Sequence, residues 1–553
     1  MATLSSQPGK LGGRNPRSSP GPVQRISRLC DFARSIESGT FHCIRTPFPL
    51  TPTREPRHTR LSLSSTLQGT PPPPEVAPAR AETPTVAVSP PARVSHHPIR
   101  RILRALAILI PIYVLAVWLD AWFTHLPPLA GTPGPGERVG ILHVHTNASC
   151  GSGSLSEVIA SAKKAALSFL AVTDHNVAMS RAAVEAADPP EFAVIDGEEV
   201  STSAGHYLAL GLTNAWPRGT SYDAHALMAS TRAAGAVNFI AHPYGLREKW
   251  RDWSVTDYEG MEIFNDDAIW RKNTIFDLFN AFILYPVDSR LALLRLARTP
   301  HENLAKWDEL QRSRPVAGIC GSDAHAAISM SGHIIARFPG YLAVFSLIRE
   351  HALLPPTPAT DAGQTSASAI LTALKNGNSF CSVDALYPAD GFTQTVTAPA
   401  TDGATRGARL HEAEIAEANT NEGKLTERKT DEAITNDTKT NDVNANEAKP
   451  SSARTNAATT PHATTITAGP GNSIAFVPGA VFHVHVPAGA PNPQIRVLRD
   501  GKEIAREQSS SLDLVLPGPG LYRAEAYLRQ PGLTGWRRWT LWVVPNPVRV
   551  TAP

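Results

Sequence analysis

The segment Gly140-Ile141-Leu142-His143-Val144-His145 ends an apolar run on two histidines that are two residues apart. Imidazole and carboxylate groups bind borderline divalent metals, and side chains at the ends of separate strands can meet at one mouth of an α/β barrel. The pattern predicts a multinuclear metal site and hydrolytic chemistry. Four later segments close apolar runs in the same way: Thr173-Asp174-His175-Asn176, Gly197-Glu198-Glu199, Ala241-His242-Pro243 and Gly321-Ser322-Asp323-Ala324-His325.

The spacing within two of these segments favours shared metal ligands. His143 and His145 lie two apart on a predicted strand, so both imidazoles point to one face. Asp323 and His325 repeat this spacing after the apolar run 316–320. One such pair alone is more often structural, but two pairs within one ordered series of motifs indicate a metal site.

The remaining ligand candidates have distinct expected roles. Glu199 can bridge two metals because its carboxylate has two oxygens, whereas Glu198 points away if the strand persists. His206 and His242 are candidate metal ligands. Alternatively, each is a structural histidine at a strand end whose ring nitrogens form ordinary hydrogen bonds. Asp174 is expected to support the site rather than to bind metal.

Short apolar strands alternate with amphipathic helices from Gly140 to about Tyr341, which is typical of repeated βα units. Ser154 and Glu157 have the spacing of a capping box at the start of the first helix. Residues 258–265 are expected to form a further barrel strand, with Glu262 and Asn265 as possible supporting groups.

The five motifs, taken in this order, resemble those of the polymerase and histidinol phosphatase (PHP) superfamily. The resemblance implies a distorted (βα)7 TIM-like barrel with two or three divalent metals (Zn, Mn or Fe) at its C-terminal face. Through the metals, Glu199, His242 and Asp323 would be the catalytic residues. The implied ligands are His143, His145, Glu199 and Asp323 for the first metal, Glu199, His206 and His242 for the second, and His175 and His325 for the third.

Cys150 departs from the family pattern, which has an Asp or His where this chain has Ser149-Cys150-Gly151. Three alternatives remain open. A thiolate favours zinc, so Cys150 could keep the third metal; the third site could lack a ligand here; or Cys150 could form a disulfide with Cys320.

An apolar run near residue 100 predicts a membrane helix at 102–123. Residues 105–119 carry no charge, and Arg100, Arg101 and Arg104 precede them, so the positive-inside rule places the rest of the chain outside the cytoplasm. The expected localisation is a single-pass membrane protein, with a cleaved signal peptide as the alternative. Residues 1–99 are rich in Pro, Ser and Arg and are expected to be disordered, to be a transit peptide or to result from an over-extended gene model.

The C-terminal part shows another composition. Residues 397–469 lack an apolar period and are expected to be a disordered linker, and short alternating strands after it predict a small all-β sandwich. This tail resembles, more weakly, that of the carbaryl-hydrolase branch of the superfamily. The expected parts of the chain are 1–99, the membrane helix 102–123, the PHP domain 138–395, the linker 397–469 and the β-sandwich 470–553.

Three functions are consistent with the sequence. The first is a metal-dependent phosphoesterase acting on a small-molecule phosphoester. The second is a carboxyl-ester or carbamate hydrolase on the same metals, and the third is a membrane-tethered binding module with a degenerate metal site. The net charge of +3 over 553 residues and the lack of a basic stripe do not indicate a nucleic-acid partner.

Overall fold

The structure is a computed structural model that describes residues 97–178, 192–212, 216, 219–246, 248–330, 333–355, 366–399, 465–532 and 538–553. The predictions for 1–96 and for 400–464 lie outside these residues. The chain forms two compact units. Of the described residues, those up to Ala116 belong to one unit and those from Val117 onward to the other.

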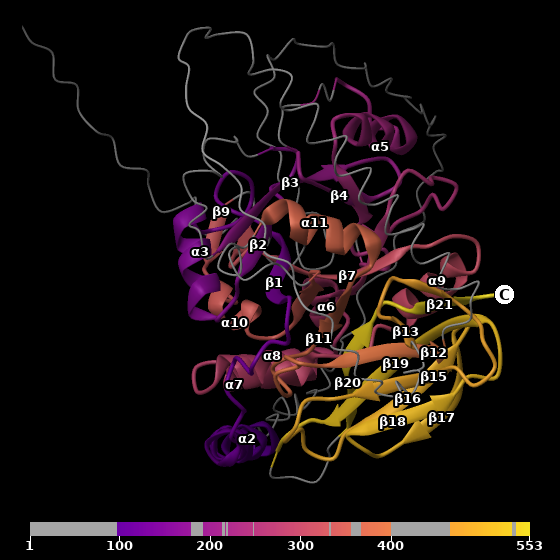
Figure 1. Ribbon diagram of the computed structural model, residues 1–553. Helices are drawn as coiled ribbons and strands as arrows, with labels where there is room; N and C mark the ends of the chain where they lie inside the picture. Colours follow the sequence, from indigo (N-terminus) through magenta and orange to yellow (C-terminus); the bar gives the residue numbers. More distant parts are fainter. Residues whose placement is uncertain are drawn as a thin grey trace, which may run out of the picture. The chain divides into compact units, whose positions relative to one another are not determined.

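Seven strands close into a barrel, as predicted (Figure 1). Most neighbouring strands are parallel, but β4 runs antiparallel to both β3 and β5. The barrel is therefore mixed, which differs from the predicted series of βα units, because a hairpin rather than a helix joins β3 to β4. The barrel strands are β1 (Glu137–Val144), β2 (Phe169–Val172), β3 (Ala193–Ser201), β4 (His206–Leu210), β5 (Val237–Ile240), β6 (Gly260–Asn265) and β7 (Ala317–Ala324), which pairs with β1.

The reversed strand has a direct consequence for the site. In a parallel barrel the carboxyl ends of the strands share one mouth, and an antiparallel strand brings its first residue there instead. His206 is the first residue of β4 and pairs with Ser201 at the end of β3. The hairpin thus places His206 at the end of the barrel where the other motifs lie.

Alternating side chains of the barrel strands enter two buried clusters. Leu142 and Phe169 belong to a cluster that also holds Ile370 and Leu374 of α11 (Ala367–Asn376). Their neighbour Leu170 packs in the larger cluster with the surrounding helices. This period of two is the expected result of a strand whose successive side chains point to opposite faces.

Helices cover the barrel. The capping box predicted at the start of the first of them, α3, is confirmed: the Ser154 side chain accepts from the backbone N–H of Glu157, and the Glu157 side chain accepts from the backbone N–H of Ser154. In addition to α11, the helices of this part of the chain are α3 (Leu155–Lys164), α5 (Ala224–Ala233), α6 (Asp266–Arg271), α7 (Ile275–Leu284), α8 (Ser289–Leu296), α9 (His301–Gln311) and α10 (Tyr341–Phe345).

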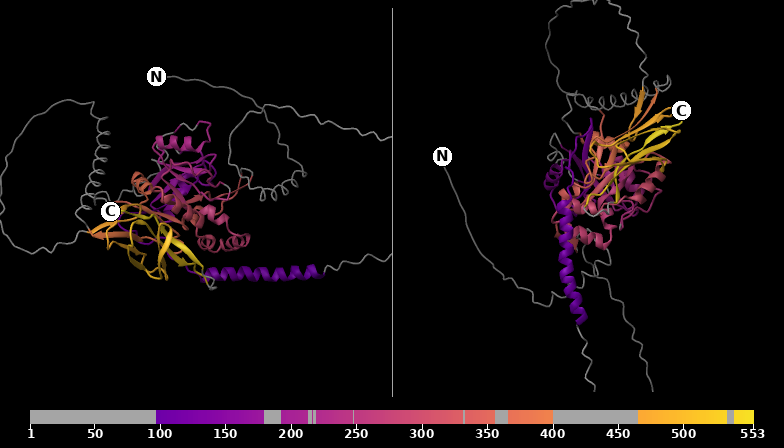
Figure 2. Two further views of the ribbon diagram at one scale, coloured as in Figure 1. Left: turned by 90° about the vertical axis from the view of Figure 1, so that its right-hand side faces the viewer. Right: turned by 90° about the horizontal axis from the view of Figure 1, so that it is seen from below.

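The barrel sheet continues into the C-terminal strands, which Figure 1 and Figure 2 draw in yellow beside the barrel. β10 (Arg349–Leu353) pairs with β1, and β11 (Ser379–Ser382) pairs with β10 and β20. The C-terminal strands are therefore bonded to the barrel. The strands of this extension are β14 (Ser473–Ala475), β16 (Gln494–Arg499), β17 (Lys502–Glu507), β19 (Gly520–Arg529), β20 (Trp539–Pro545) and β21 (Val548–Thr551).

A second sheet packs against this extension. The Phe482 ring of the second sheet lies 6.1 Å, centroid to centroid, from the Tyr522 ring of β19. Its strands β12 (Thr393–Pro399) and β13 (Thr465–Ala468) reach into the range predicted as linker, because both pair in the sheet. The other strands are β15 (Val481–His485) and β18 (Ser511–Val515), and β8 (Ile328–Met330) and β9 (His333–Ala336) form a separate hairpin.

Helix α2 (His97–Phe123) covers the predicted membrane segment (Figure 2). Within the described residues, its part Arg100–Phe123 is the one helix long and apolar enough to cross a membrane. At 1.5 Å per residue, 24 residues span ~36 Å, which exceeds the hydrocarbon core of a bilayer. A signal sequence would satisfy the same test.

Asn546 joins the barrel to the C-terminal strands. Its buried side chain accepts from the Gly318 N–H at 2.7 Å and donates to the Gly318 carbonyl at 2.9 Å, and it also donates to the Ser379 carbonyl at 3.2 Å. One amide therefore satisfies backbone groups of β7 and β11 at once.

The substitution Asn546→Ala should lower the free energy of unfolding by about 2–3 kcal/mol, because it leaves buried backbone groups without partners. Chemical denaturation of the purified chain measures this change. Asn376→Ala, at an exposed position, is the control and should change stability little. Equal stability of both variants and the parent chain would contradict the assigned role.

Candidate metal centre

The structure brings the predicted ligand residues together at one mouth of the barrel. They lie at or just beyond the ends of their strands, apart from His206, which the hairpin delivers from the start of β4. Several groups of these side chains have ligand atoms within 4.8 Å of one another, among them His143, His145, Glu199 and Asp323; His175, Glu199 and His206; and His145, Cys150, His175 and His325.

Glu199 lies at the centre of this arrangement and is fully buried. Its Oε2 atom is 3.1 Å from His143 Nε2, 3.2 Å from His145 Nε2 and 3.0 Å from His175 Nδ1. Metal–nitrogen and metal–oxygen bonds of ~2.0–2.2 Å hold neighbouring ligand atoms at about this separation. This oxygen and these imidazoles are thus spaced like ligands of a shared cation.

The other oxygen of Glu199 faces a different pair of imidazoles. Oε1 is 2.7 Å from His206 Nδ1 and 2.9 Å from His242 Nε2. The two oxygens of one carboxylate therefore serve two separate sets of histidines. An ionised carboxylate with its two oxygens arranged in this way is compatible with cations on both sides of it.

Asp323 and His325 complete the mouth. Asp323 Oδ1 lies 3.1 Å from His145 Nε2 and 3.4 Å from His143 Nε2. The His325 ring stacks on that of His145 with centroids 4.2 Å apart. Asp323 and His325 therefore both face the histidine pair His143 and His145.

Three of these residues have a strained backbone. His143, His242 and Asp323 have φ angles of 60°, 26° and 52°, in the left-handed region that residues with a side chain seldom occupy. The pairing of β1 with β2 shifts register between Ile141 and Val144, next to His143. Such strain clusters at functional sites, where the surrounding structure holds it.

Glu262 supports two of the histidines, a role that the sequence left undecided. Its Oε1 is 2.8 Å from His143 Nδ1, and its Oε2 accepts from the His242 N–H at 2.6 Å and from the Asn265 side chain at 2.7 Å. A side chain on Gly321 would begin 1.7 Å from Glu262 Oε1. Only glycine at position 321 leaves room for this carboxylate.

Asp174 was expected to support the site by orienting a ligand imidazole, but its hydrogen bonds are to a backbone N–H and to hydroxyl groups. It accepts from the Thr146 N–H at 2.8 Å, from the Thr146 hydroxyl at 2.6 Å and from the Ser149 hydroxyl. These bonds hold the loop after His145, which carries Cys150. Glu198 points away as predicted and accepts from the Trp216 indole at 2.9 Å.

Cys150 lies among histidines and is not in a disulfide. The proposed bond to Cys320 is wrong, because the Cys320 thiol is buried against Glu350 Oε2 at 3.0 Å and both cysteines are reduced. Cys150 instead shares a group of potential ligands with His145, His175 and His325. This placement is compatible with the ligand alternative.

Glu248 is a site residue that the sequence analysis missed. Its Oε2 lies 3.2 Å from His206 Nδ1, and it groups with His206 and His242 as a potential ligand. The only signal in the sequence is its position six residues after His242 in an irregular segment. Of the two cations beside it, Arg247 lies outside the described residues and Lys249 is exposed.

Burial and neighbouring charges shift the pKa values of the candidate ligands. Burial alone would raise the pKa of Glu199, but His175, His143 and His206 hold it well below its usual range. Burial lowers the pKa of His175 well below 6.5, so this imidazole is neutral, as a metal ligand must be. Burial opposes protonation of His145, yet Asp323 and Glu199 raise its pKa to about 9.

Three buried atoms at the centre have no hydrogen-bond partner: His143 Nε2, His145 Nδ1 and Glu199 Oε2. Unsatisfied buried polar atoms are costly, and a bound cation would satisfy His143 Nε2 and Glu199 Oε2 together. The donor set of imidazoles, carboxylates and one thiol matches the preferences of zinc and related divalent metals. The residues present therefore fit a metal centre.

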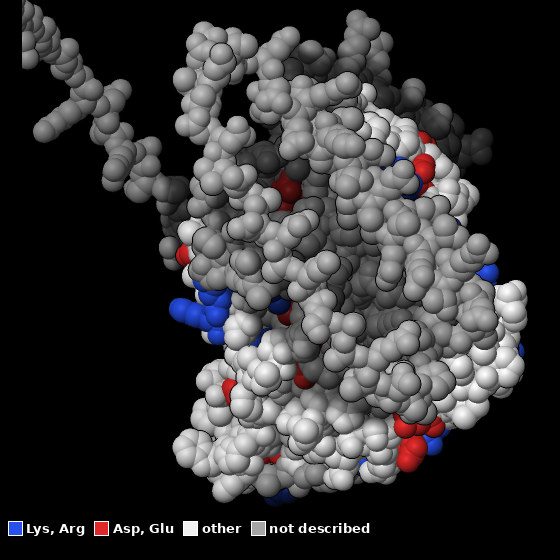
Figure 3. All heavy atoms as spheres, in the orientation of Figure 1, with Lys and Arg blue, Asp and Glu red and all other residues white. Residues whose placement is uncertain are grey.

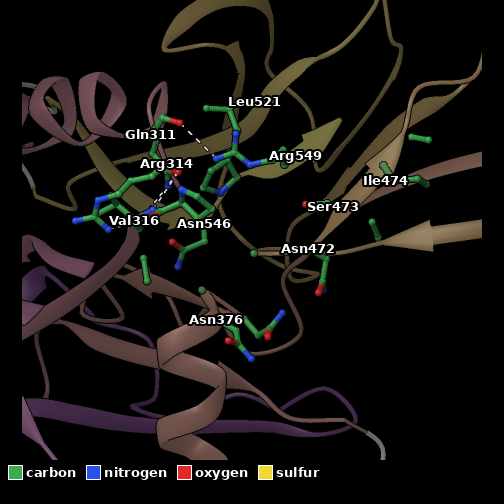
Figure 4. Close-up of a pocket in the computed structure, with 18 of the residues that line it drawn as sticks. Gln311, Arg314, Val316, Asn376, Asn472, Ser473, Ile474, Leu521, Asn546 and Arg549 are labelled. Atoms are coloured by element: carbon green, nitrogen blue, oxygen red, sulfur yellow. Dashed lines mark hydrogen bonds between the residues drawn. The ribbon is translucent and has the colours of Figure 1, made fainter. Parts of the chain in front are cut away.

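A large pocket lies elsewhere, between the barrel and the C-terminal strands (Figure 4). Arg314, Asn376, Asn546 and Arg549 line this cavity of about 1340 Å³. No residue of the metal centre lines it. The candidate chemistry is therefore assigned to the histidine-rich mouth and not to this pocket.

Comparisons with known proteins give distant structural likenesses. No protein-family model and no curated protein matches the chain. Among solved structures, a two-domain protein from Bacteroides vulgatus, containing a predicted PHP-like metal-dependent phosphoesterase, covers 74% of this chain and 97% of its own, at 12% identity and a TM-score of 0.31. A candidate metal-dependent phosphoesterase from Bifidobacterium adolescentis covers 37% and 91%, at 14% identity and a TM-score of 0.24.

The resemblance to the PHP superfamily rests on this chain's own residues. The seven-stranded barrel, the order of the motifs and the clustered candidate ligands are consistent with that resemblance. The order of the five motifs along the chain matches the PHP pattern, and in the fold the side chains of these motifs lie close together. The narrower resemblance to the carbaryl-hydrolase branch stays a prediction.

The substitution Glu262→Gln should weaken metal binding about 10- to 100-fold, because it removes the charge that orients His143. Titration of the metal-free chain with Zn²⁺ measures the dissociation constant. Glu259→Gln is the control, since Glu259 pairs with Arg232 at 2.7 Å, away from the histidines. Unchanged affinity of the Glu262 variant would show that this carboxylate does not position the ligand.

Proposed function

We propose that this chain is a metal-dependent hydrolase of the PHP type whose substrates are small-molecule phosphoesters. The observation that carries the proposal is the position of Glu199, whose two oxygens face two separate sets of histidines within 3.2 Å. Bridged metals are a recurring device of enzymes that hydrolyse phosphate esters. Two or three divalent ions of Zn, Mn or Fe are the proposed cofactors.

The proposed ligands follow the geometry. His143, His145, Glu199 and Asp323 would hold one ion, and Glu199 with His206 and His242 a second. His175, His325 and Cys150 are the proposed ligands of a third. Divalent metals held in this way would lower the pKa of a water molecule and polarise an ester oxygen.

The chain's own residues prepare this chemistry. Glu262 Oε1 lies 2.8 Å from His143 Nδ1, which leaves Nε2 as the ring nitrogen directed to the centre. Burial would raise the pKa of Glu199, but the imidazoles around it lower this pKa well below its usual range, so the carboxylate is ionised at neutral pH. Burial lowers the pKa of His143, but Asp323, Glu262 and Glu199 raise it well above 6.5, so a cation at Nε2 would have to displace a proton.

Arg271 of α6 supports the choice of a phosphoester. Its guanidinium pairs with Asp267 at 2.5 Å, and although burial opposes its charge, Asp267, Asp323 and Glu248 raise its pKa. Arginine holds phosphate oxygens through paired hydrogen bonds. We assign Arg271 the role of orienting the substrate phosphate.

The chain is further proposed to be a single-pass membrane protein with the catalytic barrel on the non-cytoplasmic side. The length and composition of α2 support the span, and Arg100, Arg101 and Arg104 at its start support the orientation. A cleaved signal peptide is the competing assignment and would leave a shorter mature chain.

Activity assays separate the proposed function from its alternatives. The full chain, loaded with Mn²⁺ or Zn²⁺, should hydrolyse aryl phosphates, and Glu199→Ala should lower kcat/KM about a thousand-fold or more, equivalent to about 4 kcal/mol of transition-state stabilisation. The matched control Glu198→Gln should retain activity, because Glu198 faces Trp216 and not the histidines.

Turnover of aryl carboxyl esters or carbamates without turnover of phosphates would favour the second candidate function. Absence of both metal and turnover after reconstitution would favour a binding module. Full phosphatase activity in the Glu199 variant would remove the proposed site.

A further inference from the structure

Helix α7 exposes large apolar side chains along one face, of which Phe282 also contacts the Phe338 ring, with ring centroids 6.2 Å apart. Ile275, Phe276, Phe279 and Phe282 are 83%, 61%, 49% and 65% exposed. Their spacing places them along one side of the helix, since residues three and four apart are neighbours on a helix surface. Such a row of large exposed side chains marks a surface that contacts another apolar phase.

The face carries no charge of its own. Asp277 is the one ionisable residue of α7. Its side chain forms a capping box with Thr274 at the start of the helix and an ion pair with Arg298 at 3.2 Å. The described side chains around α7 in Figure 3 are mostly uncharged. A polar or charged partner would find little here to bind.

The end of helix α2 lies directly beside α7. The Trp118 indole donates to the Ile283 carbonyl at 3.0 Å, and Asp120 pairs with Arg295 of α8 at 2.9 Å. Trp122 and Phe123 in this last turn of α2 are 74% and 59% exposed. The apolar face of α7 is therefore continuous with the exposed aromatic end of the helix that could span a membrane.

We infer that α7 lies on the bilayer, with its phenylalanines in the interfacial layer at the point where α2 leaves the membrane. Tryptophan and phenylalanine are typical of this layer, and helices with one apolar face lie flat within it. The inference rests on the proposed membrane span of α2 and is independent of the hydrolytic chemistry.

Such a contact would attach the barrel to the membrane at two places. The bond from Trp118 holds the end of α2 to α7, which carries the face, and the ion pair between Asp120 and Arg295 holds it to the neighbouring helix α8. The barrel would then keep one orientation relative to the bilayer instead of rotating freely on a single helix.

Photocrosslinking in vesicles tests this placement. In separate variants of the full chain, Phe279, Leu109 of α2 and Val515 of β18 are replaced by p-benzoylphenylalanine, and the protein is reconstituted in phosphatidylcholine–phosphatidylglycerol vesicles that contain a clickable lipid. Val515 is the matched control, because it is apolar and 64% exposed but lies on the second sheet. The thermal unfolding midpoint of each variant verifies the fold.

Lipid labelling should be several times stronger at Phe279 than at Val515, and as clear as at Leu109. Labelling at Leu109 but not at Phe279 would overturn the inference while leaving the membrane span intact. Labelling at neither position would remove both. A crosslink from Phe279 to a second copy of the chain, in place of lipid, would likewise overturn the inference and identify the face as a protein interface.

Discussion

The buried carboxylate of Glu199 is the group on which the rest of the site depends. Its two oxygens stand 2.7–3.2 Å from nitrogen atoms of five imidazoles that come from four different strands and loops. An ionised carboxylate without partners would be costly at this depth, and crowded imidazoles that share protons would repel one another. Divalent cations between these groups would resolve both conflicts, which is why the arrangement is best understood as a metal centre.

The fold holds this centre through strain and close contact. His143 and Asp323 adopt left-handed backbone angles, and Glu262 fits beside His143 only because position 321 is glycine. The reversed strand β4 adds His206 from the opposite chain direction. Asp174 fixes the loop that follows the first motif through three hydrogen bonds. These contacts fix the positions of the candidate ligands relative to one another.

Much of this arrangement could be predicted from the sequence. Local spacing predicted that His143 and His145, and likewise Asp323 and His325, face one site, and the capping box at Ser154 marked a helix start, because both signals depend on neighbours in the chain. The other proposed ligands followed from the resemblance to the PHP motifs. The reversal of β4, the support from Glu262 and the contribution of Glu248 could not be predicted, since they depend on contacts between residues that are far apart in sequence or in irregular segments. The shared sheet of barrel and C-terminal strands was missed for the same reason: the pairing of β11 with β20 joins residues more than 150 positions apart.

Anomalous X-ray diffraction from crystals loaded with Zn²⁺ or Mn²⁺ tests the central claim most directly. The account predicts at least two anomalous peaks at the barrel mouth, one bound by Glu199 Oε2 with His143 and His145, and the other by Glu199 Oε1 with His206 and His242. A single peak bound by one oxygen of Glu199, or peaks only outside the histidine cluster, would contradict a bridging carboxylate and with it the proposed hydrolytic mechanism.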